Sequence, residues 1–209
     1  TEFLQFKGEK LSKSQRIGIW SDEALELFPA DYWRYYLMST RPEAKDSDFS
    51  WELFIEKVNG DLNDTFGNFV HRTLTFVSTQ FSGEIPKLEK ADEDAEQTFN
   101  TIKDKVETIA GEIENCKLQS AANHMIGISR IGNQYLNEKE PWKLIKENRE
   151  KAANIFNLTA QITKVLAIVS APFTPFAAEE IWKTLNLPGT VHEQDWTEAL
   201  RPLTPGSRI

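Results

Sequence analysis

The sequence predicts an all-α fold: an antiparallel bundle of about five helices, with a short loop-and-helix segment at its N-terminus. Apolar residues recur at steps of three and four through most of the chain, and proline, glycine and polar clusters separate the segments that carry them. A pattern typical of a strand is confined to residues 1–6. The chain has 209 residues, 40% of them hydrophobic, which is enough for a sizeable core.

The first informative motif is Lys10-Leu11-Ser12-Lys13-Ser14. Its mixture of lysine and serine is typical neither of a helix core nor of a buried strand, so we expect a flexible polar loop. Such a loop can surround a polyphosphate with ammonium and hydroxyl groups, and a mobile cation there stabilises the charge on a pyrophosphate leaving group. On composition alone, a solvated turn is the commoner explanation of such a loop.

Two short helices are expected after this loop. Ser21 has the character of an N-cap, because two acidic residues occupy the first turn that follows it, and the helix continues to Phe28. Pro29 separates it from the next helix, since proline fits the first turn of a helix but not its interior. That second helix, residues 30–39, is rich in aromatic residues, as expected of a helix buried between layers.

The bundle is expected between residues 51 and 185, and an irregular tail from residue 188. The predicted helices cover about residues 51–81, 92–115, 117–138, 149–169 and 176–185, with a short helical turn at 142–146. The first of them has its apolar stripe at Leu53, Phe54, Val58, Leu62, Phe66, Phe69, Thr73, Phe76 and Val77. Small residues in the third helix, Gly132 among them, would let a neighbouring helix approach closely. We therefore divide the chain at residues 1–46, 47–187 and 188–209.

Composition limits the classes of function. The net charge of −8 argues against a general nucleic-acid-binding surface, but it permits a shaped RNA site with local cations and aromatic rings. The single cysteine, Cys116, excludes an internal disulfide and fits a reducing cytosol. The histidines His71, His124 and His192 lack metal-ligand spacing, so we expect no metal site. No apolar run reaches membrane-spanning length, and we expect a cytoplasmic protein without a membrane partner.

Two further features suggest more than packing. Asn68 and Arg72 are spaced i and i+4, so they lie on one side of the predicted long helix, beside its apolar stripe. An amide beside a guanidinium can read base edges or hold a phosphate, although ordinary flank residues share this spacing. Trp142 follows Pro141 at a helix start, among several lysines. An aromatic plane in basic surroundings can stack on an unpaired base, although a core tryptophan that anchors the turn is the commoner case.

Several stretches together resemble the methionyl-tRNA synthetase family of class I aminoacyl-tRNA synthetases. Residues 10–14 resemble the KMSKS signature of that class, with Leu11 at the position that is usually methionine. The other similar stretches are residues 30–37, 48–51, 67–72, 130–136 and 140–143. The Pro-Trp pair in the last of them favours the methionine enzymes over the related isoleucine, valine, leucine and cysteine enzymes. Residues 17–19 and 130–133 are similar to the archaeal or eukaryotic branch.

The resemblance implies a role for the loop in nucleotide activation. Lys13 is expected to act catalytically, by contacting the phosphates of ATP while methionine is activated, and Lys10, Leu11, Ser12 and Ser14 are expected to shape the loop. ATP with Mg²⁺ would act in the full-length enzyme, and zinc would be held only in its catalytic half. The sequence contains neither the His-Ile-Gly-His signature nor a zinc knuckle of that half. We therefore expect residues 1–46 to be the end of the catalytic half, and the chain alone to be inactive.

The resemblance also implies an RNA partner. Asn68 and Arg72 match positions that contact the anticodon, Trp142 matches a tryptophan that stacks on it, and Pro141 would set the pose of that ring. Residues 47–187 would then recognise the C-A-U anticodon of methionine tRNA. Two alternatives stay open: the equivalent bundle of another class I synthetase, and a helical interaction domain that binds a partner through its acidic face without RNA.

Overall fold

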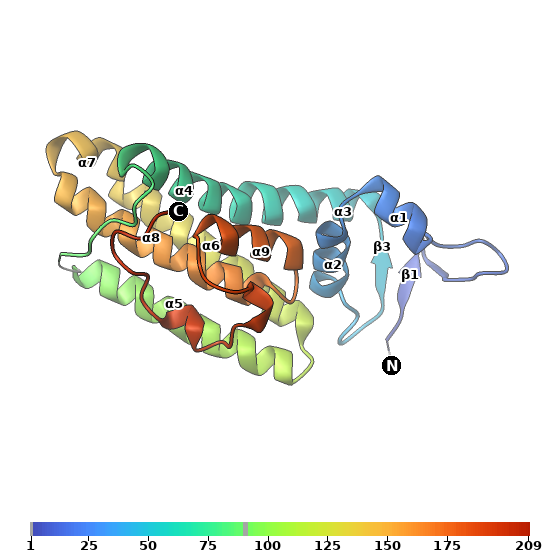
Figure 1. Ribbon diagram of the computed structural model, residues 1–209. Helices are drawn as coiled ribbons and strands as arrows, with labels where there is room; N and C mark the ends of the chain where they lie inside the picture. The colour runs from blue at the N-terminus through green and yellow to red at the C-terminus, as the bar shows by residue number, and fades with distance from the viewer. Residues whose placement is uncertain (1, 90–91) are drawn as a thin grey trace.

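The computed structural model describes residues 2–89 and 92–209, and the all-α prediction is confirmed (Figure 1). The helices are α1 (Ser21–Leu27), α2 (Ala30–Ser39), α3 (Trp51–Glu56), α4 (Asn68–Gln80), α5 (Glu93–Glu114), α6 (Leu118–Lys139), α7 (Pro141–Glu147), α8 (Arg149–Ser170) and α9 (Pro175–Thr184). A π-helix, η1 (Lys57–Gly67), joins α3 to α4. The bounds of the five long helices thus agree with the sequence prediction to within about two residues, apart from the change of helix type inside the first.

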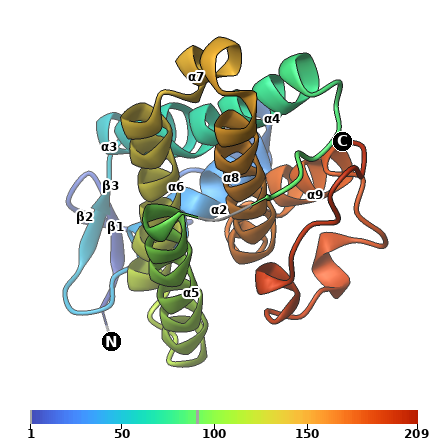
Figure 2. The same ribbon diagram turned by 90° about the vertical axis from the view of Figure 1, so that its left-hand side faces the viewer.

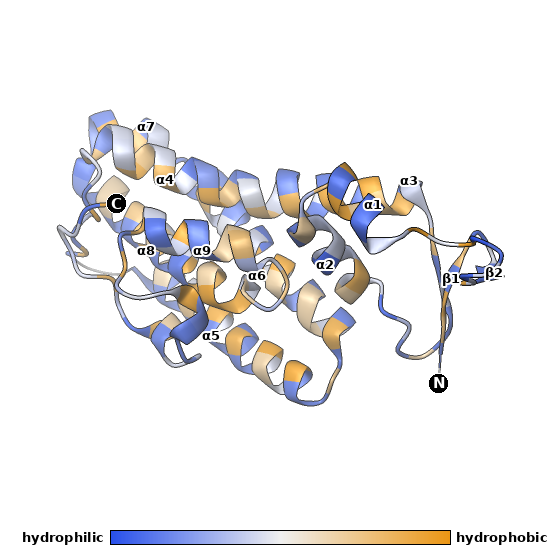
Figure 3. Ribbon diagram, turned by 45° about the vertical axis from the view of Figure 1, so that its right-hand side comes forward, coloured by the Kyte–Doolittle hydropathy of each residue, from blue (hydrophilic) through white to orange (hydrophobic). Residues whose placement is uncertain are grey.

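Helix α8 is the centre of the bundle. It packs against α4, α5, α6, α7 and α9, and Figure 2 shows α6 and α8 side by side with α7 above them. In contrast to the sequence expectation, one helix, Arg149–Ser170, is by length and hydropathy apolar enough to cross a membrane, but 83% of its apolar stretch is buried inside the protein. That burial identifies it as the core helix of a bundle. By contrast, hydrophobic and hydrophilic residues both occur along α5 in Figure 3, as expected of a helix with one exposed face.

The π-helix differs from the plain α-helix that the apolar pattern predicts over residues 51–81. The buried residues Phe54, Val58, Leu62 and Phe66 are spaced four apart. An α-helix has 3.6 residues per turn, so a spacing of four fits an α-helical stripe as well as the i→i+5 hydrogen bonding found here, and the apolar pattern alone does not distinguish the two. The result is one continuous rod that ends in α4.

The N-terminal segment contains a small sheet of order β2-β1-β3. Strand β1 (Leu4–Phe6) pairs antiparallel with β2 (Glu9–Lys10) and parallel with β3 (Ser47–Phe49). The strand predicted at residues 1–6 is confirmed for Leu4–Phe6, while Thr1 lies outside the described residues; β2 and β3 were missed because two or three residues show no alternation. The predicted N-cap is wrong as well. Ser21 is the first residue of α1, and the N-cap position is Trp20.

Helix α2 and the tail both pack onto the bundle. Tyr35 of α2 lies in the main core, while Trp33 and Tyr36 join a second aromatic cluster against the sheet, so the predicted burial of this helix between layers is confirmed. The tail contains two short 3-10 helices, η2 (Val191–Glu193) and η3 (Glu198–Leu200). Buried Lys164 of α8 donates to Glu198 Oε1 at 2.5 Å and so ties the tail to the core.

Candidate nucleic-acid interface

Arg72 is the centre of a polar cluster at the α7 end of the bundle. Its guanidinium carbon lies 5.4 Å from the centre of the Trp142 ring, within the range of a cation–π contact. Its Nη2 donates to Asn137 Oδ1 at 3.0 Å, and its Nη1 to Asn133 Oδ1 at 3.4 Å. Three helices, α4, α6 and α7, therefore hold one guanidinium in a fixed place.

Trp142 is half-buried, so it is neither a core residue nor a free surface ring. It stacks against Phe76 of α4 with ring centres 6.3 Å apart and an interplanar angle of 27°. Pro141, buried at the first position of α7, follows Glu140, whose φ of 42° makes the sharp corner between α6 and α7. This corner and the stacked phenylalanine set the orientation of the Trp142 ring.

Two of the lysines near Trp142, Lys139 and Lys143, are paired with carboxylates, which reduces the basic surroundings expected from the sequence. Lys143 lies 2.7 Å from a carboxylate oxygen of Glu140, and Lys139 donates to Asp94. This contact with Lys139 lowers the pKa of the Asp94 carboxyl below its usual value. The cation against Trp142 is thus Arg72 rather than a lysine.

An open groove of about 570 Å³ runs beside this cluster, between the η1–α4 rod and α6. Its lining is polar and rich in side-chain amides: Asp64, Thr65, Asn68, Arg72, Arg130, Asn133, Gln134, Asn137 and Glu138. Asn68 is exposed, and within the described ranges no protein group is hydrogen-bonded to its side-chain amide. The groove therefore offers both donors and acceptors to a planar polar ligand.

The structure places Asn68 and Arg72 in one groove and Arg72 against Trp142, and it adds residues that the prediction missed. Asn133 holds Arg72 and also donates from Nδ2 to the carbonyl oxygen of Thr65 at 2.9 Å. The signal for it was present, because Asn133 and Asn137 repeat on the third helix the i, i+4 spacing of Asn68 and Arg72.

The loop of residues 10–14 lies at the opposite end of the molecule from α7 (Figure 1). Two backbone hydrogen bonds of 3.0 and 2.9 Å pair Ser12 with Ile17 and close a hairpin around Lys13 and Ser14. The hydroxyls of Ser12 and Ser14 are 3.3 Å apart, and Lys13 is exposed. Lys10 and Leu11 are exposed at the base of this hairpin.

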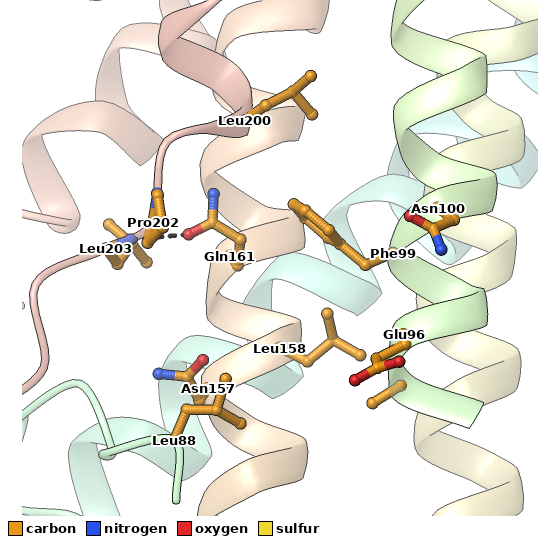
Figure 4. A pocket seen from close by; sticks show the side chains of 11 residues that line it. Leu88, Glu96, Phe99, Asn100, Asn157, Leu158, Gln161, Leu200, Pro202 and Leu203 are labelled. Atoms are coloured by element: carbon orange, nitrogen blue, oxygen red, sulfur yellow. Dashed lines mark hydrogen bonds between the residues drawn. The ribbon is translucent and has the colours of Figure 1, made fainter. Parts of the chain in front are cut away.

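A second cavity, of about 360 Å³, lies between α5, α8 and the tail (Figure 4). Phe99, Leu158, Leu200 and Leu203 give it a mainly apolar lining, and no lysine or arginine lines it among the described residues. It therefore lacks the cations that an RNA site requires. In the described part of the chain, no group of His, Cys, Asp and Glu side chains could hold a metal ion.

Comparisons with known proteins agree on one family. The family described as "tRNA synthetases class I (M)" matches residues 1–74, and "Anticodon binding domain of methionyl tRNA ligase" matches residues 85–209. The chain is 44% identical to the methionine–tRNA ligase of Aeropyrum pernix over 100% of its own length, and 43% identical to that of Korarchaeum cryptofilum over 97%. It spans only 36% and 38% of those two relatives.

A solved structure shares the fold. Methionyl-tRNA synthetase of Mycobacterium tuberculosis, in complex with methionyl-adenylate, matches 99% of this chain with a TM-score of 0.91 at 23% identity. The chain corresponds to 41% of that protein.

Proposed function

Since the chain belongs to the methionyl-tRNA ligase family, we propose that its α7 end reads the C-A-U anticodon of methionine tRNA. The observation that carries this proposal is the contact with Trp142 of Arg72, which itself lines an amide-rich groove. RNA sequence is usually read from unpaired bases, by stacking on an aromatic ring and by hydrogen bonds to base edges. Trp142 supplies the ring and the groove supplies the hydrogen-bonding groups, with Arg72 belonging to both.

Each residue has a distinct part in this proposal. Trp142 stacks on one anticodon base, and Pro141 fixes the pose of its ring. Arg72 and Asn68 meet a base edge: cytosine presents an amino donor next to acceptor atoms, and an amide oxygen beside a guanidinium complements that arrangement. Asn133 and Asn137 pre-orient Arg72, so less conformational entropy is lost on binding.

The loop is proposed to act on ATP in the longer protein. The exposed Lys13 would contact the phosphates, with Lys10, Leu11, Ser12 and Ser14 shaping the loop; two hydroxyls 3.3 Å apart in a loop with two exposed lysines fit an anionic ligand. ATP with Mg²⁺, and methionine, would bind the part of the protein that this chain does not include, and any zinc would lie there. A soluble enzyme of translation in the cytoplasm, without a membrane partner, is consistent with these roles.

We keep the division into residues 1–46, 47–187 and 188–209 as a proposal. In it, the first part ends the catalytic half, the second is the anticodon-binding domain, and the third is a tail that packs on α8. Pairing of β1 with β3 joins the first two parts.

The test is binding of the 209-residue chain to an anticodon stem-loop with C-A-U and to the same RNA with one anticodon base changed. The unchanged RNA is expected to bind more tightly. Trp142→Ala should lower its affinity by about 5- to 150-fold, which corresponds to about 1–3 kcal/mol per stacked base. Phe176→Ala, which removes an aromatic ring that is 67% exposed on α9, is the control and should bind as the parent does.

Helical circular dichroism should be the same for both variants. Equal binding of the two RNAs by the parent chain would contradict the proposal and favour an interaction domain that does not use RNA.

A further inference from the structure

Arg130 lies in the groove, yet it takes no part in the contact between Arg72 and Trp142. It comes from α6, one turn before Asn133, and its side chain is 62% exposed. Its Nη2 donates to Asp61 Oδ1 at 3.0 Å. A guanidinium has five N–H donors, and within the described ranges Asp61 is the one protein acceptor bonded to this side chain. Donors on Arg130 therefore remain for a ligand.

Asp61 is held from two other directions. Its side chain is only 12% exposed, and its Oδ2 accepts from the Tyr35 hydroxyl at 2.8 Å and from Lys57 Nζ at 3.1 Å. Burial and the neighbouring Asp61 charge raise the pKa of Tyr35, so its hydroxyl stays a donor. The Asp61 carboxylate thus contacts two cations, Lys57 and Arg130, so this group of three side chains keeps a net positive charge. The contact also holds Arg130 in position.

The charges in the groove leave one place for an anion. Arg72 lies against Trp142 and gives two of its five N–H donors to the Asn133 and Asn137 amides, and in the proposed function its remaining donors meet a base edge. The carboxylates of Asp64 and Glu138, which line the same groove, repel a phosphate. Arg130 is the remaining cation among the lining residues, and a planar guanidinium binds two phosphate oxygens at once.

We propose that Arg130 binds a backbone phosphate of the anticodon loop, and that Asp61 is its positioning residue. The inference rests on the proposed RNA function of the groove, and it assigns base contacts and backbone contacts to different residues. Arg72, Asn68 and Trp142 meet bases and carry the sequence preference. Arg130 meets the backbone, so it contributes affinity that does not depend on sequence.

The experiment compares Arg130→Gln with the parent chain on the two stem-loop RNAs between about 50 and about 200 mM salt. The variant should lose the same factor of affinity for both RNAs. Its plot of log affinity against log salt should become shallower by about 0.7 to 1, the value for one lost phosphate contact. Lys183→Gln is the matched control, because Lys183 on α9 is also 62% exposed and paired with a carboxylate; its salt slope should equal that of the parent.

The positioning role has a separate readout. Asp61→Asn should weaken binding of both RNAs equally, and the double variant Arg130→Gln/Asp61→Asn should bind no worse than Arg130→Gln alone, with folding checked by circular dichroism. Additive losses would overturn the positioning role.

The two proposals fail in different ways. If the parent chain prefers C-A-U but Arg130→Gln keeps the parent salt slope, or loses its preference for one base, the phosphate role is overturned and the anticodon function stands. If the parent chain shows no preference, the anticodon function itself fails.

Discussion

Replacement of Gly132 by alanine tests the close approach of α6 to α4 that builds one side of the groove. A Cβ at this position would lie 2.4 Å from Phe69 Cε2 and 2.6 Å from Phe69 Cζ. Non-bonded carbon atoms rest about 3.5–4.0 Å apart, so the ring must retreat by roughly 1 Å. Phe69 is fully buried, so its ring can retreat only by displacing other side chains of a close-packed core.

The expected cost follows from two opposing effects. Overpacking a core costs about 1–3 kcal/mol, while alanine in place of glycine inside a helix returns up to about 1 kcal/mol. Gly132→Ala should therefore lower the free energy of unfolding by about 0–2 kcal/mol when the full helix gain is realised. Because Asn133 is the next residue and holds Arg72, the variant should also weaken binding of the C-A-U stem-loop.

Urea unfolding of Gly132→Ala and Gly127→Ala measures the packing cost. Gly127 lies on the same helix, and a Cβ there meets only the flexible end of Lys105, at 3.4 Å. This control should be as stable as the parent or more stable. The difference between the two variants, about 1–3 kcal/mol, isolates the cost of displacing Phe69. Equal stability of both variants would refute the close approach.

Two further predictions concern pH and chemistry. Because burial and Asp61 raise the pKa of Tyr35 above its ordinary value of 10.0, the folded chain keeps this proton at pH values where the unfolded chain releases it. The free energy of unfolding should fall above pH 10 by about 1.4 kcal/mol per pH unit for this tyrosine, and Tyr35→Phe should make the decline shallower by that amount; an unchanged slope in urea titrations would contradict it. Separately, the chain alone should not exchange pyrophosphate into ATP in the presence of methionine, and measurable exchange would disprove that expectation.

Local periodicity was sufficient to predict the long helices, and insufficient for the details that depend on tertiary contacts. The apolar stripe placed Phe54, Val58, Leu62 and Phe66 on one buried face, but a spacing of four is compatible with both α and π hydrogen bonding. Only packing against the rest of the bundle decides between them. The strand Ser47–Phe49 was missed for a similar reason, since it exists through its pairing with β1, which lies more than 40 residues earlier in the chain.

The candidate site shows the same division. Asn68 and Arg72 could be paired from their spacing on one helix, and Asn133 with Asn137 could have been found by that same rule. Arg130 and Asp61 are 69 residues apart in the sequence. Their contact exists only through the packing of the helices, so no local pattern predicts it. The contact of Arg72 with Trp142 could be expected only from the resemblance to a family, because no local sequence pattern connects α4 with α7.

Helix α2, which follows the loop segment, docks on the bundle through contacts with two helix ends. The buried Asp31 carboxylate accepts the N–H groups of Phe176 and Ala177, at 3.3 and 2.8 Å, at the N-terminus of α9. Arg34 Nη2 donates to the carbonyl oxygen of Pro172 at 2.7 Å, just beyond the C-terminus of α8. An anion thus meets the positive end of one helix dipole and a cation the negative end of another, which favours both contacts. These contacts tie α2, and with it the N-terminal segment that carries the loop, to the bundle that carries the groove. The net charge of −8 repels RNA in general, so the proposed RNA binding depends on the local cations of the groove.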